Sequence, residues 1–295
     1  MPVAQLNELV NDHLKKIGYE KPKGMIFSPR GSLKNAILAG NGTEITITGP
    51  GEMSVVMGVL QYYEAISTDF HFSCEKIEGQ NAAIKQLISG NSPGAWILVS
   101  VYYQAFYAAI QIARLTGKYN ISFENKHLST INENSLSEQR LDQTGTYLSR
   151  SVGLNSQGYI SMILVKEGEK PHKMAWQNLD SLISKSSIEK YHSRPNVYRL
   201  NKLFKEIICS TMDQWPLPSS VRNDLNYSLI NSYDSSFSKK TRELQSFFDS
   251  EDFSKAKQWG LRQRKTIDIE DHISSVGFIS IMLRETVKSL REKLT

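Results

Sequence analysis

The longest apolar stretch of the chain runs from Ala95 to Lys118 and carries no charged residue as far as Ala113. Its small residues Ala105, Ala109 and Ala113 recur every four positions, which places them on one face of a helix. This pattern predicts a buried helix that a second helix approaches closely. Gly117 is placed to cap the C-terminus of this helix.

The same stretch is also long enough to cross a membrane as a helix. Several of its residues, including Ser100, Gln104 and Gln111, carry hydrogen-bonding groups. Each such group is costly in lipid unless it is paired. We therefore expect a helix in a protein core, and no membrane partner.

Apolar residues also recur at helical spacing in most other parts of the chain. The helices that this spacing predicts cover Ala4–Ile17, Ser54–Ile66, Ile77–Ile88, Pro171–Ile183, Val197–Met212, a segment that starts near Ser220, and Ile269–Leu294. Ser219 or Ser220 is the expected N-cap of the helix that starts near Ser220. The last helix is expected to be strongly amphipathic, with its apolar residues at three- and four-residue steps.

Two regions lack a sustained helical period. The first, from Gly24 to Pro50, contains turns and one alternating strand at Glu44–Thr48. The second follows the apolar helix, is rich in Ser, Asn and Gln, and has short strands predicted at Asn120–Phe123 and Tyr159–Val165. We therefore predict a mainly α-helical bundle: an accessory region at 1–53, and a bundle domain at 54–295 with an irregular, partly β insertion at 119–169.

Composition narrows the class of protein. A chain of 295 residues with 40% hydrophobic residues can form a sizeable core. No secretion signal is recognisable at the N-terminus, and Cys74 and Cys209 form neither a disulfide framework nor a zinc motif, so a cytoplasmic location is expected.

The net charge of +5 is clustered, because residues 236–265 contain eight basic and four acidic residues. Clustered positive charge favours an anionic partner.

The most basic part of that segment is KAKQWGLRQRK, from Lys255 to Lys265. An aromatic ring between cations suits phosphate contacts combined with base stacking. The candidate nucleic-acid-binding residues are Lys255, Lys257, Trp259, Arg262, Arg264 and Lys265. A solvated surface linker is the alternative, because such charge runs are often merely solvated.

Other motifs offer little chemistry. ITITGPGEMS, from Ile45 to Ser54, has the order of a phosphate-binding loop but lacks the Gly-Lys-Ser/Thr ending. Asp268, Glu270, Asp271 and His272 include three acids, which the dipole favours at a helix N-terminus without any metal. The histidines form no HExxH motif. We therefore expect no metal and no cofactor.

A family resemblance appears in Ser219–Tyr233, where Arg222-Asn223 stands near a predicted helix start. Upstream lie a Tyr-Tyr-x-x-Phe-Tyr helix at Tyr102–Tyr107 and a Lys-Pro-His-Lys stretch at Lys170–Lys173. In type and order these pieces resemble the HEPN superfamily of prokaryotic helical proteins, over roughly 77–233. The resemblance implies an RNase site in a cleft between two protomers, in which an Arg, often followed by Asn, works with a His a few residues later.

The chain departs from that pattern at the histidine. Tyr227 stands where the family's His would most naturally fall, and no His lies between Asn223 and Tyr233. A tyrosine with an ordinary pKa near 10 is a poor general base at neutral pH. Arg222 can still bind a phosphate, with Asn223 to orient it. The alternative is that Arg222 and Asp224 merely occupy a helix N-terminus.

With this departure, the resemblance implies RNA or nucleotide binding, or a degenerate RNase of a bacterial defence or toxin system, more readily than ordinary RNA cleavage. Arg222, Asn223 and Tyr227 are its candidate catalytic residues. The alternative from another class is a non-catalytic scaffold or subunit that binds a protein partner or a second copy of itself through its helices. Binding that weakens steeply with salt distinguishes the first function from the second.

Overall fold

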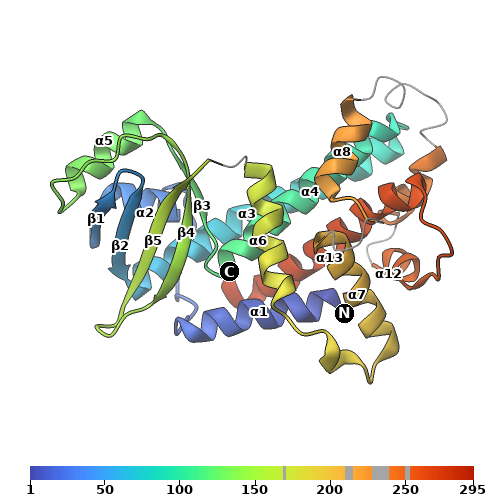
Figure 1. The fold of residues 1–295 in the computed structure, drawn as a ribbon, viewed down its shortest axis with the longest axis horizontal. Helices are drawn as coiled ribbons and strands as arrows, with labels where there is room; N and C mark the ends of the chain where they lie inside the picture. The colour runs from blue at the N-terminus through green and yellow to red at the C-terminus, as the bar shows by residue number, and fades with distance from the viewer. Residues whose placement is uncertain (169–170, 210–214, 228–238, 250–252) are drawn as a thin grey trace. The chain divides into compact units, whose positions relative to one another are not determined.

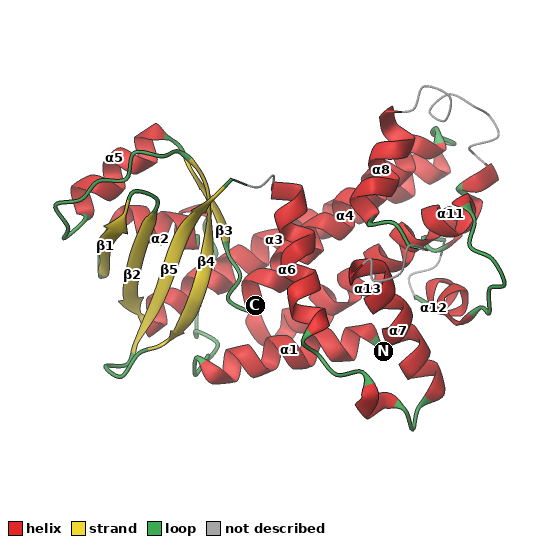
Figure 2. Ribbon diagram, in the orientation of Figure 1, coloured by secondary structure: helices red, strands yellow, loops and turns green. Residues whose placement is uncertain are grey.

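The computed structural model describes residues 1–168, 171–209, 215–227, 239–249 and 253–295, with the side chains of 225–227 left out. It is mainly α-helical with one antiparallel sheet, as Figures 1 and 2 show. The helices are α1 Pro2–Lys16, α2 Leu33–Ala39, α3 Val59–Ser89, α4 Gly94–Leu115, α5 Asn125–Asn134, α6 Pro171–Ser184, α7 Pro195–Cys209, α8 Pro218–Tyr227, α11 Arg242–Ser246, α12 Ser254–Leu261 and α13 Ile269–Leu294, with short 3-10 helices at Pro29–Gly31 and Glu189–Tyr191. The strands are β1 Thr43–Gly49, β2 Glu52–Gly58, β3 Asn120–Phe123, β4 Gly145–Leu154 and β5 Tyr159–Glu167.

The chain forms two compact units that interleave along the sequence. The sheet unit consists of Glu8–Cys74, Ile110–Met174 and Leu290–Thr295. The helical unit consists of Met1–Asn7, Glu75–Ala109 and Ala175–Ser289. The domain boundary predicted near residue 53 stays a prediction.

The sheet has the strand order β1-β2-β5-β4-β3, and every neighbouring pair is antiparallel. Residues alternate between buried and more exposed positions along β1 and β2, as expected for strands with one face against a core. Val55 of β2, for example, is fully buried and pairs with the fully buried Met162 of β5. The strand predicted at Glu44–Thr48 is confirmed within β1.

The helix predicted from Ser54 to Ile66 is wrong in its first part. Residues up to Gly58 belong to β2, and α3 begins at Val59. Met53, Val55 and Met57 are buried at every second position, the period of a strand. β2 pairs with β1 on one side, across a short turn, and with β5 on the other, so it lies inside the sheet. The alternation of Met53, Val55 and Met57 was a local signal for a strand, and the helix prediction overlooked it.

The insertion predicted to be irregular at 119–169 is regular in most of its length, so that part of the prediction is wrong. The strands predicted at Asn120–Phe123 and Tyr159–Val165 are confirmed as β3 and within β5. The helix α5 and the strand β4 were not predicted. In β4 the register shifts between Ser149 and Ser151, which interrupts the alternation that would have marked it as a strand.

The predicted apolar helix is confirmed as α4. Ala105 and Ala109 are fully buried and Ala113 is 1% exposed, so this face meets neighbouring atoms as expected. Gly117 follows the helix at φ +79°, a left-handed conformation that suits glycine, and Lys118 N donates to Ala113 O. Among the described helices, α4 has the length and hydropathy of a membrane span, and 67% of its most apolar window is buried inside the protein.

Ala109→Leu is expected to overpack the helical unit and lower the free energy of unfolding by about 1–3 kcal/mol. The fully buried methyl of Ala109 leaves no room for a larger side chain without displacement of its neighbours. Ala82→Leu on the exposed side of α3 is the control and should change stability by less than about 0.5 kcal/mol. Thermal melts compare the two, and equal midpoints would show that α4 tolerates bulk on this face.

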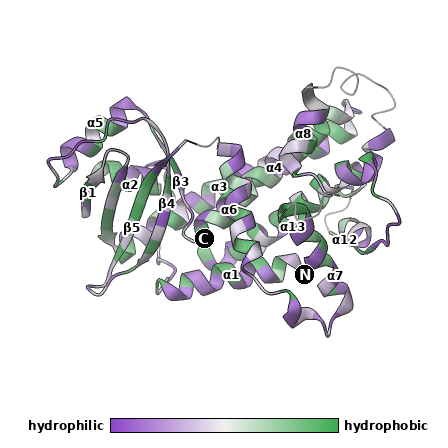
Figure 3. Ribbon diagram, viewed as in Figure 1, coloured by the Kyte–Doolittle hydropathy of each residue, from purple (hydrophilic) through white to green (hydrophobic). Residues whose placement is uncertain are grey.

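The most completely buried part of α13 runs from Ile273 to Leu283. In Figure 3, stretches of α4 and α13 carry the hydrophobic colour. Polar residues within this part of α13 are buried too, and Ser280 Oγ donates to Gln104 Oε1 of α4 at 2.7 Å. The prediction of a strongly amphipathic helix is therefore wrong for this part, because a helix enclosed on all sides has no solvent face.

Candidate nucleic-acid interface

The predicted basic stretch lies in α12 and in the loop that follows it. Trp259 of α12 is 1% exposed and packs against Phe278, Trp215 and Phe247, with ring centroids 5.5–6.1 Å apart. Gly260 permits this packing, because a Cβ there would lie 2.7 Å from Leu200 of α7. The expectation that Trp259 stacks on bases needs an exposed ring, so the structure corrects it: the indole belongs to the core.

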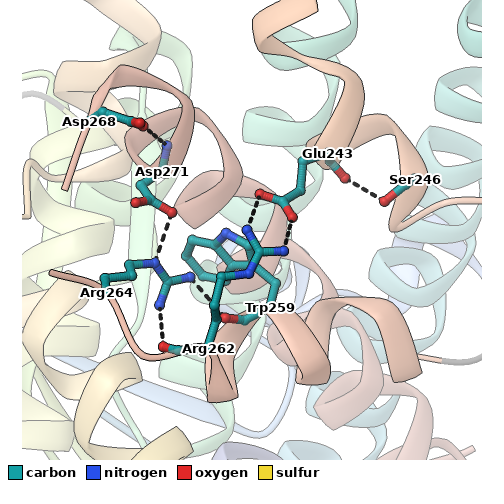
Figure 4. Close-up of polar contacts among 7 residues, drawn as sticks. All are labelled: Glu243, Ser246, Trp259, Arg262, Arg264, Asp268 and Asp271. Carbon is teal, nitrogen blue, oxygen red and sulfur yellow. Dashed lines mark hydrogen bonds and ion pairs between the residues drawn. The ribbon is translucent and has the colours of Figure 1, made fainter. Parts of the chain in front are cut away.

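Arg264 is held by partners on several sides, as Figure 4 shows. Its Nε donates to Asp271 Oδ1 at 2.8 Å, Nη2 to Trp259 O at 2.8 Å, and Nη1 to Arg262 O at 3.2 Å. The guanidinium also lies 4.0 Å from the centroid of the Trp259 ring. The side chains of Arg264 and Asp271 are only 9% and 13% exposed. Arg264 therefore stabilises the loop, and few of its donors are left for a ligand.

Arg262 has a different environment. Its Nη1 donates to Glu243 Oε2 of α11 at 3.3 Å and its Nη2 donates to Glu243 Oε1, so the ion pair is bidentate (Figure 4). The Arg262 side chain is 55% exposed. This ion pair is open to water, whereas that of Arg264 is not.

The loop after α12, together with α7, Trp215 and His272 at the start of α13, encloses an open cavity of about 870 Å³. Of the described residues that line it, five are Lys or Arg and one is Glu. The basic ones are Arg199, Lys202, Arg262, Arg264 and Lys265. Positive charge therefore gathers around a concave surface, as an anionic ligand requires.

Three of these cations keep donors for a ligand. Arg199 uses Nη2 for Leu261 O at 2.9 Å, which leaves its other nitrogens. Lys202 Nζ lies 3.8 Å from Glu206 Oε1, a long and partly exposed pair. Lys265 is exposed and forms no ion pair with any residue that the structure describes. Burial raises the pKa of the Glu206 carboxyl, and the charge of Lys202 partly offsets this effect.

Of the other predicted residues of the basic stretch, Lys255 binds Asp249 at 2.8 Å. Neither Lys255 nor Lys257 belongs to the described lining of the cavity. The predicted stretch therefore contributes Arg262, Arg264 and Lys265 to the cavity. Arg199, Lys202 and His272 were not predicted. The one signal for Arg199 and Lys202 was their i, i+3 spacing on a predicted helix. This spacing is too common among helices to indicate a binding site.

The motifs behind the HEPN resemblance are partly brought together. The guanidinium of Arg222 on α8 lies 4.9 Å from the ring centroid of Tyr102 and 5.8 Å from that of Tyr103, both on α4. Trp176 Nε1 donates to the Tyr102 hydroxyl at 3.3 Å. Burial raises the pKa of Tyr102, partly offset by Trp176 and Arg222. Arg222 thus stacks on an aromatic surface, as arginine does at cation–π contacts.

The other pieces of this motif set are less well defined. Asn223 is exposed. Tyr227 ends α8, and its side chain lies outside the described residues, as does Lys170. The predicted N-cap is wrong: α8 already begins at Pro218, and Ser220 N donates to Leu217 O, so Ser219 and Ser220 lie inside the first turn. Proline suits that first position because its missing N–H would be unpaired there.

Among the residues that the structure describes, no group of three or more His, Cys, Asp or Glu side chains is arranged to hold a metal. The acidic residues at the start of α13 have other partners: Asp268 Oδ1, just before the helix, accepts from Asp271 N at 2.9 Å, and Asp271 pairs with Arg264. The two cysteines are free.

No family model, no curated protein and no solved structure matches the chain. The resemblance to the HEPN superfamily therefore rests on the short motifs alone.

Proposed function

We propose that the protein binds RNA, or a nucleotide with the same phosphate chemistry, at the basic cavity beside α7 and α12. The observation that carries the proposal is the cavity itself, where five Lys and Arg side chains and one Glu line about 870 Å³. Phosphate groups are the main source of affinity in nucleic-acid binding, and Lys and Arg supply the contacts. Trp259 is buried, so we do not propose that it stacks on bases.

The expected contacts come from Arg199, Lys202 and Lys265, because these cations are the least committed to other groups. Arg199 and Lys202 are three positions apart on α7, so they lie on one face of the helix. Lys265 comes from the loop after α12. Three cations on two segments can hold successive phosphates of a single strand.

Replacement of Arg199, Lys202 and Lys265 by Gln is expected to weaken binding of a labelled oligouridylate and flatten its salt dependence. If each residue neutralises one phosphate of a single strand, the slope of log Kobs against log salt falls by about 2. Fluorescence titrations over a range of salt concentrations measure both quantities.

The control carries the same loss of charge elsewhere in the helical unit. Lys185, Arg194 and Lys288 are exposed, again two lysines and one arginine, and none of them lines the cavity. Their replacement by Gln should preserve most of the affinity and of the slope. Equal losses in the two triple variants would mean that diffuse charge, and not the cavity, attracts the RNA.

Membership of the HEPN superfamily, a role in bacterial defence and dimer formation stay proposals that the motifs support. Arg222 beside Tyr102 and Tyr103 is a second candidate phosphate contact. We propose no cleavage step, because Tyr227 replaces the expected His.

A scaffold function is the second candidate, and the indole of Trp96, 62% exposed, favours it. A protein partner bound there would dissociate little as salt rises.

A further inference from the structure

Arg262 and Arg264 stand two positions apart, and each is paired with one carboxylate in the described part of the chain. Arg264 is nearly buried and has two carbonyl oxygens besides Asp271 as acceptors. Arg262 is 55% exposed, and its guanidinium donates to Glu243 (Figure 4). The two pairs therefore differ in how easily they can exchange their partner.

The Arg262–Glu243 pair is the exchangeable one. An exposed ion pair contributes little to stability, because water and salt screen it. Separation of the nearly buried Arg264–Asp271 pair would instead leave an uncompensated charge in the protein. Arg262 lines the cavity, whereas Glu243 is not part of its described lining. A ligand in the cavity can thus reach Arg262 without displacing the Glu243 backbone.

Glu243 is held in place independently of Arg262. It lies in α11, whose neighbouring residue Leu244 is fully buried, and Phe247, just after the helix, is 2% exposed. Ser246 Oγ donates to Glu243 O at 2.7 Å. Its carboxylate presents two oxygens to the guanidinium, as a phosphate does. Glu243 therefore occupies Arg262 in the way that a phosphate of the ligand would.

We infer that Glu243 is an internal competitor that occupies Arg262 in the free protein, and that Arg262 exchanges it for a phosphate of the bound ligand. This inference rests on the proposed function, and it assigns regulation to the same cavity. It also specifies the ligand, which must present two oxygens of one anionic group to a planar fork, as a phosphodiester backbone does. Arg262 thereby becomes a specificity-determining contact that lysine cannot reproduce.

Glu243→Gln is expected to bind a labelled oligouridylate more tightly than the wild type, by up to about fivefold, the fold-change that corresponds to loss of one exposed ion pair. Asp249→Asn is the matched control. It also removes one negative charge from an exposed pair, that of Lys255, at residues outside the described cavity lining. The control should change the affinity much less.

The mechanism requires Arg262, which a second pair of variants tests. Arg262→Gln should lower the affinity and the salt slope by about one phosphate contact, and Arg262→Lys should not restore wild-type affinity. Added to Arg262→Gln, the Glu243→Gln substitution should have no more effect than Asp249→Asn. Arg242→Gln, at an exposed residue beside Glu243 and outside the described lining, is the control for loss of a cation.

Each contrary outcome has a separate meaning. If the wild type binds RNA but Glu243→Gln and Asp249→Asn have equal effects, the competitor role is overturned and the proposed function stands. If Glu243→Gln tightens binding equally with and without Arg262, the gain comes from net charge and the inference is also overturned. If the wild type binds neither oligouridylate nor a nucleotide, the proposed function fails and the inference fails with it.

Discussion

Asp271→Ala is expected to lower the free energy of unfolding by about 3–5 kcal/mol, because it breaks a nearly buried ion pair. The substitution leaves the guanidinium of Arg264, which is 9% exposed, without its carboxylate partner. The two carbonyl oxygens and the Trp259 ring that remain offer only partial charges. Denaturant unfolding followed by circular dichroism measures the loss.

The control for this prediction is Asp249→Ala, which removes an exposed partner of Lys255 and should cost less than about 1 kcal/mol. A double variant, Arg264→Met with Asp271→Ala, should recover part of the loss, because it removes the buried charge together with its partner. Similar losses for Asp271→Ala and Asp249→Ala would contradict the assignment of Arg264 and Asp271 as a buried structural pair.

Acidification from pH 7 to pH 4 is expected to remove up to about 3 kcal/mol of stability through His13 alone. Burial, and next the charge of Lys16, lower the pKa of His13 from 6.5 to about 4. The unfolded chain therefore takes up a proton at this residue below about pH 6.5, whereas the folded chain takes it up only near pH 4. The stability from neutral His13 is present above pH 6.5 and is lost as the pH falls through that window.

The structure explains why His13 resists protonation. Its Nε2 is buried and has no hydrogen-bond partner within the described part of the chain. A Cβ at Gly117 would lie 2.8 Å from the ring, so the imidazole sits against the turn that ends α4. His13→Phe should flatten the fall of the melting temperature between pH 6.5 and 4, and His192→Phe, at an exposed histidine, should not. An unchanged pH profile in His13→Phe would contradict the low pKa.

Much of the helical framework could be predicted from local pattern. The apolar run of α4, its alanine face and the cap at Gly117 follow from spacing alone, and so do the bounds of α13. The sheet could be predicted only in part. β2 pairs with β5, which lies about a hundred residues later in the chain, and β4 and β3 complete the sheet beyond β5. The burial of α13 on all sides also depends on elements that are distant in the sequence. The spacing of its hydrophobic residues does not reveal which elements surround it.

The candidate site was predictable only in its most local component. The basic stretch is visible in the sequence, but the degree to which each of its side chains is buried is not. Trp259 and Arg264 became interior residues because α12 packs closely on α7 through Gly260. Arg199 and Lys202 come from a helix some sixty residues earlier, and Glu243 from a third segment. Only the folded chain shows which cations surround the cavity and which are already paired.

The central claim is that RNA binds in the basic cavity, and photocrosslinking tests it most directly. An oligouridylate that carries 4-thiouridine would be irradiated with the intact wild-type chain, and the crosslinked peptides would be identified by mass spectrometry. We predict crosslinks in 199–206 and 262–272, the segments that supply most of the cavity lining, and their loss at high salt. Crosslinks confined to the sheet unit, or none at a salt concentration where RNA binds, would contradict the assignment.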